Sequence, residues 1–249
     1  MISLHSYKIL IVTKKKEKME RINLKNDLKV DLKLEKIWSD RYKEKDKIIA
    51  PLYQIEVLEK EVTFLSINPS LPPNGRIDAT KGFYPHPPYP MIDYNKEKKE
   101  IYPFFRKFYE IGEALNQPWT MLDLLYERES TQAELEIKYN PKTITENDKN
   151  FLQNQIKLTF EILESIRPKV VVISNAGTDK LIHFNLKDLK IVQELPCEEN
   201  GFVYKLNGIP FISNESRFLG SPQHFNRSKK DGRLEKLVNE IKRVSNTKQ

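Results

Sequence analysis

The sequence of 249 residues predicts a three-layer α/β/α sandwich around a central, mainly parallel four-stranded sheet. From residue 61 onward, apolar runs of strand length alternate with stretches of helical spacing, the order that builds parallel strands covered by helices on both faces. The run KVVVI is a continuous β-branched segment typical of a central parallel strand. We expect residues 61–249 to form this α/β domain and residues 1–60 to be a charged embellishment packed on its core.

The first sixty residues combine dense charge with a few apolar positions. A strand is predicted over residues 8–13. Two stretches with partial helical spacing follow, with apolar positions at Leu32, Leu34, Ile37 and Trp38 in the first and at Ile48, Leu52, Ile55 and Leu58 in the second. Both a solvated face over a narrow apolar stripe and a dedicated binding arm fit this pattern.

The stretch EVTFLSINPS, residues 61–70, predicts a core strand that stops at Asn68-Pro69. Ligands of open α/β sheets bind beyond the carboxyl ends of the strands, so Asn68 is a candidate site residue. A loop rich in Pro and Tyr then runs through Pro103. Loops of this length in a compact domain are usually functional or disordered, and the aromatic residues favour function.

The remaining elements follow in alternation. Helices are predicted over 102–115, over 151–166 up to Arg167-Pro168, from 178 onward, and in the terminal segment RLEKLVNEIKRV. Strands are predicted over 120–130, where Asp123 lies in an apolar run, and over 169–177, which ends at Asn175. FVYKLNGIPFIS predicts a hairpin with Asn207-Gly208 as its turn.

Composition narrows the classes of function. The 42 Lys and Arg residues exceed the 35 Asp and Glu residues, and this excess of +7 favours polyanionic partners, nucleic acid first and anionic membrane surfaces second. The single cysteine, Cys197, excludes an intrachain disulfide and a cysteine metal cluster, which favours a cytoplasmic location. No run approaches the roughly 20 apolar residues of a membrane-spanning helix. Nucleotide-binding and metalloprotease motifs are absent, so we expect no cofactor and no metal.

Several motifs together resemble the uracil-DNA glycosylase superfamily, in particular a bacterial branch near its mismatch-specific and single-strand-selective members. The first motif of those branches, Gly-x-Asn-Pro-Gly or Ser, is similar to residues 66–70, SINPS. The loop KGFYPHP leading into YPFF, and the segment KVVVISNAGTDKL, are also similar. The second motif, usually His-Pro-Ser, corresponds to FLGSPQH, residues 218–224. Ser66 replaces the leading Gly, and Ser221-Pro222-Gln223 replaces His-Pro-Ser.

The resemblance implies a role for each matching residue. Asn68 would hold a water with its amide oxygen, and His224 would donate a hydrogen bond to the leaving base. Tyr84 or Phe83 would stack on an extruded base. The other residues expected to contact the substrate are Ser66, Ile67, Ser70, Asp123, Asn175, Ser221 and Gln223. The residues expected to contact the DNA backbone are Arg227, Lys229, Lys230 and Arg233.

The residues alone leave structural alternatives open. Asn68 also fits an Asx-turn that ends its strand, and the aromatic loop residues also fit packing against the core. A buried Asp123 must be paired or protonated, with Arg128 and Glu129 as possible neighbours. Lone loop histidines are often solvated or capping, and the basic segment also fits a solvated face.

Three functions of different classes follow from these patterns. The first is a monomeric DNA glycosylase-like hydrolase that cleaves the N-glycosidic bond of an extruded damaged, mismatched or modified base. The second is a nucleic-acid-binding module that has the fold without the chemistry, which the altered second motif favours. The third is a hydrolase of free nucleosides or nucleotides, which needs no basic helix end.

Overall fold

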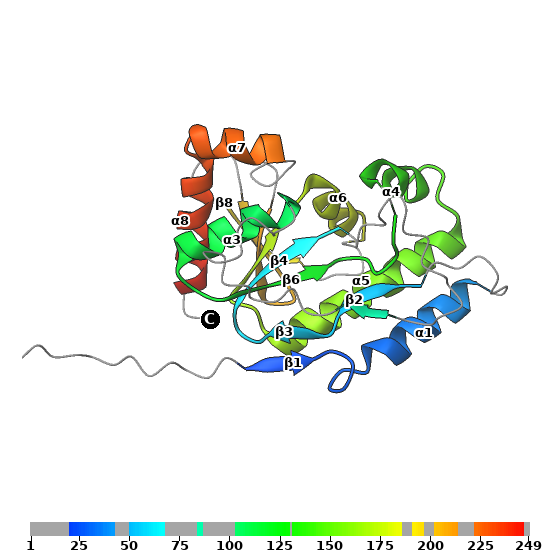
Figure 1. Cartoon of the computed structure of the whole chain (residues 1–249). Coiled ribbons are helices and arrows are strands. Elements are labelled where there is room, and N and C mark those ends of the chain that lie inside the picture. The colour runs from blue at the N-terminus through cyan, green and yellow to red at the C-terminus, as the bar shows by residue number, and fades with distance from the viewer. Residues whose placement is uncertain are drawn as a thin grey trace, which may run out of the picture.

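The protein is an α/β fold with a mainly parallel central sheet flanked by helices (Figure 1). The computed structural model describes residues 20–42, 50–67, 84–86, 103–129, 131–185, 191–196, 202–213 and 222–246. The central sheet has the strand order β6-β4-β7-β10-β9-β8. The first four of these strands pair in parallel, and β9 and β8 continue the sheet in antiparallel pairs.

The strands of the central sheet are β4 (Val62–Ser66), β6 (Trp119–Asp123), β7 (Val170–Ile173), β8 (Ile191–Pro196), β9 (Phe202–Leu206) and β10 (Ile209–Ile212). Two small sheets pair β1 (Arg21–Asn23) with β3 (Glu56–Leu58), and β2 (Leu52–Gln54) with β5 (Tyr84–His86). The helices are α1 (Val30–Arg41), α3 (Pro103–Leu115), α4 (Gln132–Lys138), α5 (Glu146–Ile166), α6 (Ala176–Asn185), α7 (Pro222–Lys230) and α8 (Arg233–Asn246).

Alternate residues of the central strands pack into two separate cores. Phe64 of β4 faces a core made with Phe108 of α3 and Leu237 of α8. Leu65, one residue further along, faces a larger core that includes Trp38 of α1 and Phe160 of α5. This alternation is the two-residue period of a strand that is buried on both faces. The molecule therefore has three layers, with α3 and α8 on one face of the sheet and α1 and α5 on the other (Figure 1).

The predicted count of four strands is wrong for the sheet as a whole, which has six strands among the described residues, although its parallel part has four. The extra strands come from the predicted hairpin and from β8, which pairs with its outer edge. Asn207 and Gly208 form the hairpin turn with positive φ angles of 49° and 78°. Such angles suit the tight turns that match the twist of antiparallel strands.

The N-terminal region contributes to the main core over its described part. Leu34 and Trp38 of α1 are buried there, which confirms the first predicted helix, whereas Leu32, expected among its apolar positions, is 59% exposed. The second predicted helix is wrong, because residues 52–58 form β2 and β3. Backbone pairing with β5 and β1 outweighs the helical spacing of the apolar positions in this segment. The strand predicted over residues 8–13 lies outside the described residues.

The segment after β6 also differs from the prediction. The strand predicted through residue 130 ends at Asp123, so Asp123 lies at its carboxyl end and not in its middle. The chain leaves the ladder there because the N–H groups of Leu124 and Leu125 both donate to the end of β4. α4 follows, and its Thr131 cap and Glu134 bond reciprocally as a capping box.

Candidate functional site at the carboxyl edge of the sheet

The parallel strands β6, β4, β7 and β10 end on one side of the sheet, which we call the carboxyl edge. Asp123 at the end of β6 pairs in register with Ser66 at the end of β4. Residues in register on neighbouring strands point to the same face, so their side chains are neighbours. The Ser66 hydroxyl is buried and lies 3.0 Å from the hydroxyl of Ser174, which follows β7. The edge therefore places polar groups from three adjacent strands side by side.

Asp123 is the titratable group at the end of β6. Its side chain is half-buried, and among the described residues none forms a hydrogen bond or ion pair with its carboxyl. Burial raises the pKa of Asp123 to about 7, because desolvation disfavours the charged form. Tyr126 is a titratable neighbour: burial raises its pKa, and the charge of Asp123 raises it further. The carboxyl therefore changes its protonation near neutral pH.

This raised pKa has a consequence for stability. In the unfolded chain Asp123 ionises near pH 4, whereas in the folded chain it stays neutral up to about pH 7. Between these values the unfolded state loses its proton first, so the free energy of unfolding decreases as the pH rises and the loss is complete above pH 7. Asp123→Asn cannot ionise. The free energy of unfolding of Asp123→Asn minus that of the wild type, measured by urea unfolding, should therefore increase from pH 4 to pH 8 by on the order of 2–4 kcal/mol.

An exposed aspartate provides the control for this experiment. Asp40→Asn on α1 removes a carboxylate that is not buried, so it reports the general effect of the charge change. If the free energies of unfolding of the wild type and of Asp123→Asn differ by the same amount at every pH, Asp123 ionises in the folded protein as it does in water.

Asn175 caps the helix that begins at this edge. Its side-chain oxygen accepts hydrogen bonds from the Thr178 N–H at 2.9 Å and from the Thr178 hydroxyl at 3.1 Å. This is the usual role of an Asn before the first turn of a helix. A substrate contact of Asn175 stays a prediction. Because the side-chain oxygen caps α6, such a contact would be made by the amide NH₂ group.

Gly177 allows α6 to approach the end of β4 closely. A Cβ atom at this position would lie 2.9 Å from Ile67 Cδ1 and 2.7 Å from Gln132 Nε2. Both distances are shorter than non-bonded atoms tolerate. Ile67 is buried and directly precedes Asn68 in the sequence. The glycine therefore permits the packing around Ile67, the residue that leads to Asn68.

Gly177→Ala is expected to destabilise the protein by about 1–3 kcal/mol, because overpacking displaces Ile67 and Gln132. The sign is informative, since alanine in an unobstructed helix position stabilises relative to glycine by up to about 1 kcal/mol. Thermal unfolding measures the change. Adding Gln132→Ala opens one side of the contact and should recover part of the loss; a single variant as stable as the wild type would contradict the close packing.

The predicted stacking residue Tyr84 belongs to β5, and its Cα lies opposite that of Leu52 on β2. The Leu52 N–H donates to the Tyr126 carbonyl, three residues beyond Asp123. The backbone of β5 is therefore connected, through β2, to the segment that follows Asp123. Gln223 and His224 belong to the first turn of α7, and the structure describes the backbone but not the side chains of Tyr84, Gln223 and His224. Asn68, Ser70, Phe83 and Ser221 lie outside the described residues.

The predicted phosphate contacts fall on helices, whereas the first three were expected in a loop. Arg227, Lys229 and Lys230 belong to α7. Lys229 pairs with Glu110 of α3 at 2.5 Å, and Arg233 pairs with Asp231 at 2.6 Å.

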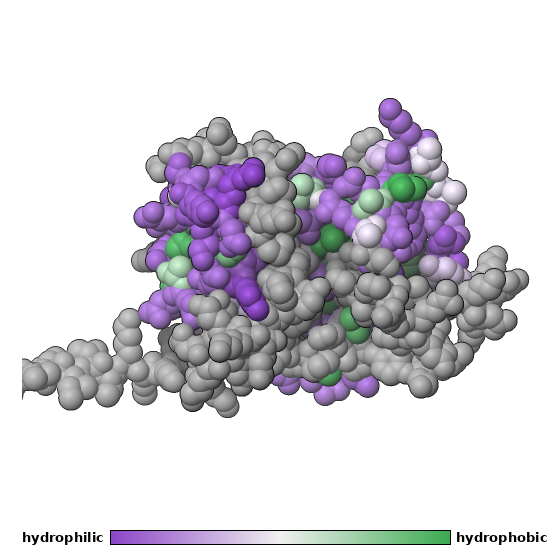
Figure 2. Space-filling model, turned by 45° about the horizontal axis from the view of Figure 1, so that its top comes forward, coloured by the Kyte–Doolittle hydropathy of each residue, from purple (hydrophilic) through white to green (hydrophobic). Residues whose placement is uncertain are grey.

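Arg227 and Lys230 are exposed and have no ion pair within the described part of the chain. Figure 2 shows hydrophilic residues gathered on the side of the molecule where α7 and α8 lie. Two of the four cations are therefore available to a phosphate without losing a carboxylate partner.

Sequence reasoning missed several polar residues around the edge. Ser213 follows β10 and donates to the buried Asp179 carboxylate of α6 at 3.0 Å, which ties two elements together at the edge. Gln155 and Thr159 lie fully buried on the apolar face of α5. The signal was present, because polar residues on an apolar helix face require partners.

The described residues contain no group of His, Cys, Asp and Glu side chains arranged to hold a metal ion. Within the same residues, no helix is long and apolar enough to cross a membrane. No protein-family model matches the chain, and no curated protein matches it either.

Proposed function

We propose that this protein is a DNA glycosylase-like hydrolase that takes an extruded base into the carboxyl edge and cleaves its N-glycosidic bond. One observation carries the proposal. Asp123, a half-buried carboxyl with a pKa of about 7, adjoins Ser66 on the strand that leads directly to Asn68. A pH-sensitive hydrogen-bonding group thus lies beside the segment that resembles the first glycosylase motif.

The chemistry of the reaction suits these groups. Cleavage passes through an oxocarbenium-like sugar while the base leaves with negative charge, so the site must position a water and stabilise the base. Asn68 would hold the water with its amide oxygen. An amide cannot take up the proton of that water, so its contribution is positioning.

Protonated Asp123 would contact the base. A neutral carboxyl offers an O–H donor beside a carbonyl acceptor, which matches a base edge with adjacent C=O and N–H groups, as in uracil, thymine and hypoxanthine. The ionised carboxylate only accepts hydrogen bonds and repels a leaving anion. The neutral form therefore favours both binding and departure of such a base.

Arg227 and Lys230 support DNA as the substrate, because exposed cations on one helix can neutralise backbone phosphates. The ion pairs of Lys229 and Arg233 favour a second candidate, a hydrolase of free nucleosides or nucleotides, since cations with carboxylate partners are less available to phosphates. Strong and steeply salt-dependent DNA binding would exclude this second candidate.

A panel of oligonucleotides tests the proposal. Single- and double-stranded substrates carrying uracil, hypoxanthine, a thymine mismatch or a modified cytosine are incubated with the protein and treated with alkali, which breaks the strand at abasic sites. We expect strand breaks with at least one base that has adjacent C=O and N–H groups. Tight binding without an abasic product across the panel would instead identify a binding module.

A further inference from the structure

Every backbone N–H group from Leu124 to Glu127, directly after β6, has a defined acceptor. Leu124 donates to the Ser66 carbonyl at 2.8 Å and Leu125 to the Ile67 carbonyl at 2.9 Å. The next two N–H groups, of Tyr126 and Glu127, donate to the side-chain oxygen of Gln155 at 2.9 and 3.0 Å. The segment is thus held between the end of β4 and helix α5.

Helix α5 provides a second contact one turn further along. The Thr159 hydroxyl lies 2.9 Å from the Leu124 carbonyl oxygen and 3.3 Å from the Asp123 carbonyl oxygen. It also lies 2.9 Å from the Tyr126 hydroxyl. Gln155 and Thr159 are four residues apart, so they share one face of the helix. Both are fully buried. Each makes two contacts of hydrogen-bond length with the backbone of residues 123–127.

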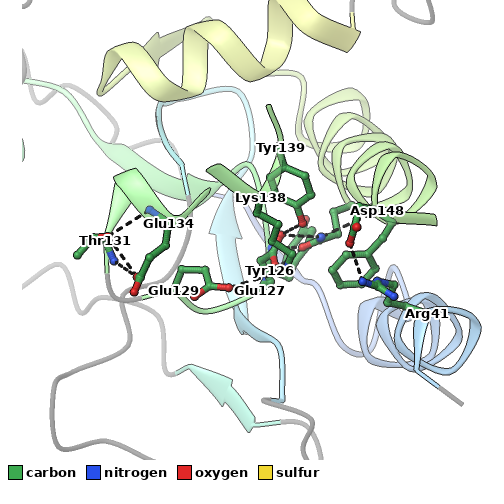
Figure 3. A network of polar contacts seen from close by, with 11 residues as sticks. Arg41, Tyr126, Glu127, Glu129, Thr131, Glu134, Lys138, Tyr139 and Asp148 are labelled. Atoms are coloured by element: carbon green, nitrogen blue, oxygen red, sulfur yellow. Dashed lines mark hydrogen bonds and ion pairs between the residues drawn. The ribbon is translucent and has the colours of Figure 1, made fainter. Parts of the chain in front are cut away.

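The orientation of the Gln155 amide is also fixed. Its NH₂ group donates to the Glu127 carboxylate at 3.4 Å and to the Phe151 carbonyl at 3.5 Å, so its oxygen must face the two backbone N–H groups. Glu127 in turn accepts hydrogen bonds from Lys138 and from the Tyr139 hydroxyl (Figure 3). The network in Figure 3 therefore selects the one amide orientation that can hold the segment.

We infer that Gln155 and Thr159 are positioning residues, which keep the Asp123 carboxyl in a fixed relation to the peptide that leads into Asn68. The hydrogen bond from the Leu125 N–H to the Ile67 carbonyl connects the segment after Asp123 to the peptide before Asn68. Gln155 and Thr159 hold this segment after Asp123 against α5. Neither residue is assigned a contact with the substrate. Their role rests on the proposed function, since it concerns the residues that would bind the base and the water.

A matched pair of variants tests this role. Thr159→Val removes the hydroxyl and keeps the shape, whereas Thr159→Ser keeps the hydroxyl. The readout is the titration of the Asp123 carboxyl carbon by NMR, with its signal assigned by its absence in Asp123→Asn. We expect the serine variant to titrate near pH 7, as the wild type does. The valine variant should titrate closer to the value of about 4 of a solvated aspartate, because a released segment admits water to the carboxyl.

A nearby packing change serves as the control. Ile162→Val on α5 removes one buried methyl group and keeps the hydrogen-bonding groups of Gln155 and Thr159, so it should lower stability and leave the titration unchanged. If Thr159→Val does not fold, Gln155→Met removes the other contact and should shift the titration in the same direction.

The titration requires no activity, so the two proposals fail separately. A wild-type titration in a folded Thr159→Val or Gln155→Met variant overturns the positioning role, even if the enzyme releases bases. A shifted titration in the variant, together with a wild-type protein that releases no base from any oligonucleotide, supports the positioning role and rejects the glycosylase function.

Discussion

Asp123→Asn is expected to remove the decline of base release above pH 7. The amide presents a donor and an acceptor at every pH, whereas the carboxyl loses its donor when it ionises. With the pKa of Asp123 at about 7, the wild-type single-turnover rate should fall about 100-fold from pH 6 to pH 9, and the variant rate should change less than about threefold. Rates measured across this range on the preferred oligonucleotide provide the comparison.

Asp123→Leu provides the opposite control, because it removes both donor and acceptor. Its single-turnover rate at pH 6 should be about 10²–10³-fold lower than that of the wild type, which is the effect of removing one preorganised hydrogen-bond donor. If Asp123→Asn declines above pH 7 as steeply as the wild type, another group controls the profile and Asp123 does not contact the base.

Glu127→Leu is expected to cause the largest loss of stability among the substitutions considered. Glu127 is buried and accepts from Lys138, Tyr139 and Gln155, so its removal leaves a cation and two buried polar groups without their shared partner (Figure 3). Breaking a buried pair from one side costs about 3–5 kcal/mol. Urea unfolding at pH 7 should show a loss in this range.

Two comparisons separate this effect from a general loss of charge. Glu56→Gln breaks the exposed pair with Arg21 at 3.2 Å and should cost less than about 1 kcal/mol. Adding Lys138→Met to Glu127→Leu removes the cation that is left with only its longer pair to Glu129, at 3.7 Å, and should recover part of the loss. A cost below about 1 kcal/mol for Glu127→Leu would mean that water replaces the whole network.

The sequence was sufficient to predict the buried strand at whose end the candidate site is proposed. A β-branched run that stops at Asn-Pro marks both a buried strand and its open end, and the structure ends β4 at Ser66, two residues before Asn68. The β-branched run at residues 170–173 likewise forms the parallel strand between β4 and β10. Such local patterns are reliable because burial on both faces leaves few other conformations for the chain.

The position of Asp123 could not be predicted in the same way. The run TMLDLLY stays apolar past Asp123, so periodicity alone extends the strand, whereas hydrogen bonds to β4 and α5 turn the chain at Leu124. These contacts join residues 58 positions apart for β4 and 35 positions apart for α5, and no local pattern encodes them. The six-stranded sheet was missed for a related reason, since β8 joins it only by pairing with β9.

Release of the free base under single-turnover conditions, detected by mass spectrometry, tests the central claim most directly. With the preferred oligonucleotide at pH 6, the wild type should release the base and leave an intact abasic strand. Asn68→Ala should release it about 10²–10³ times more slowly, with DNA affinity unchanged. Equal rates for the two proteins, or no released base from any oligonucleotide of the panel, would contradict a glycosylase site at the carboxyl edge.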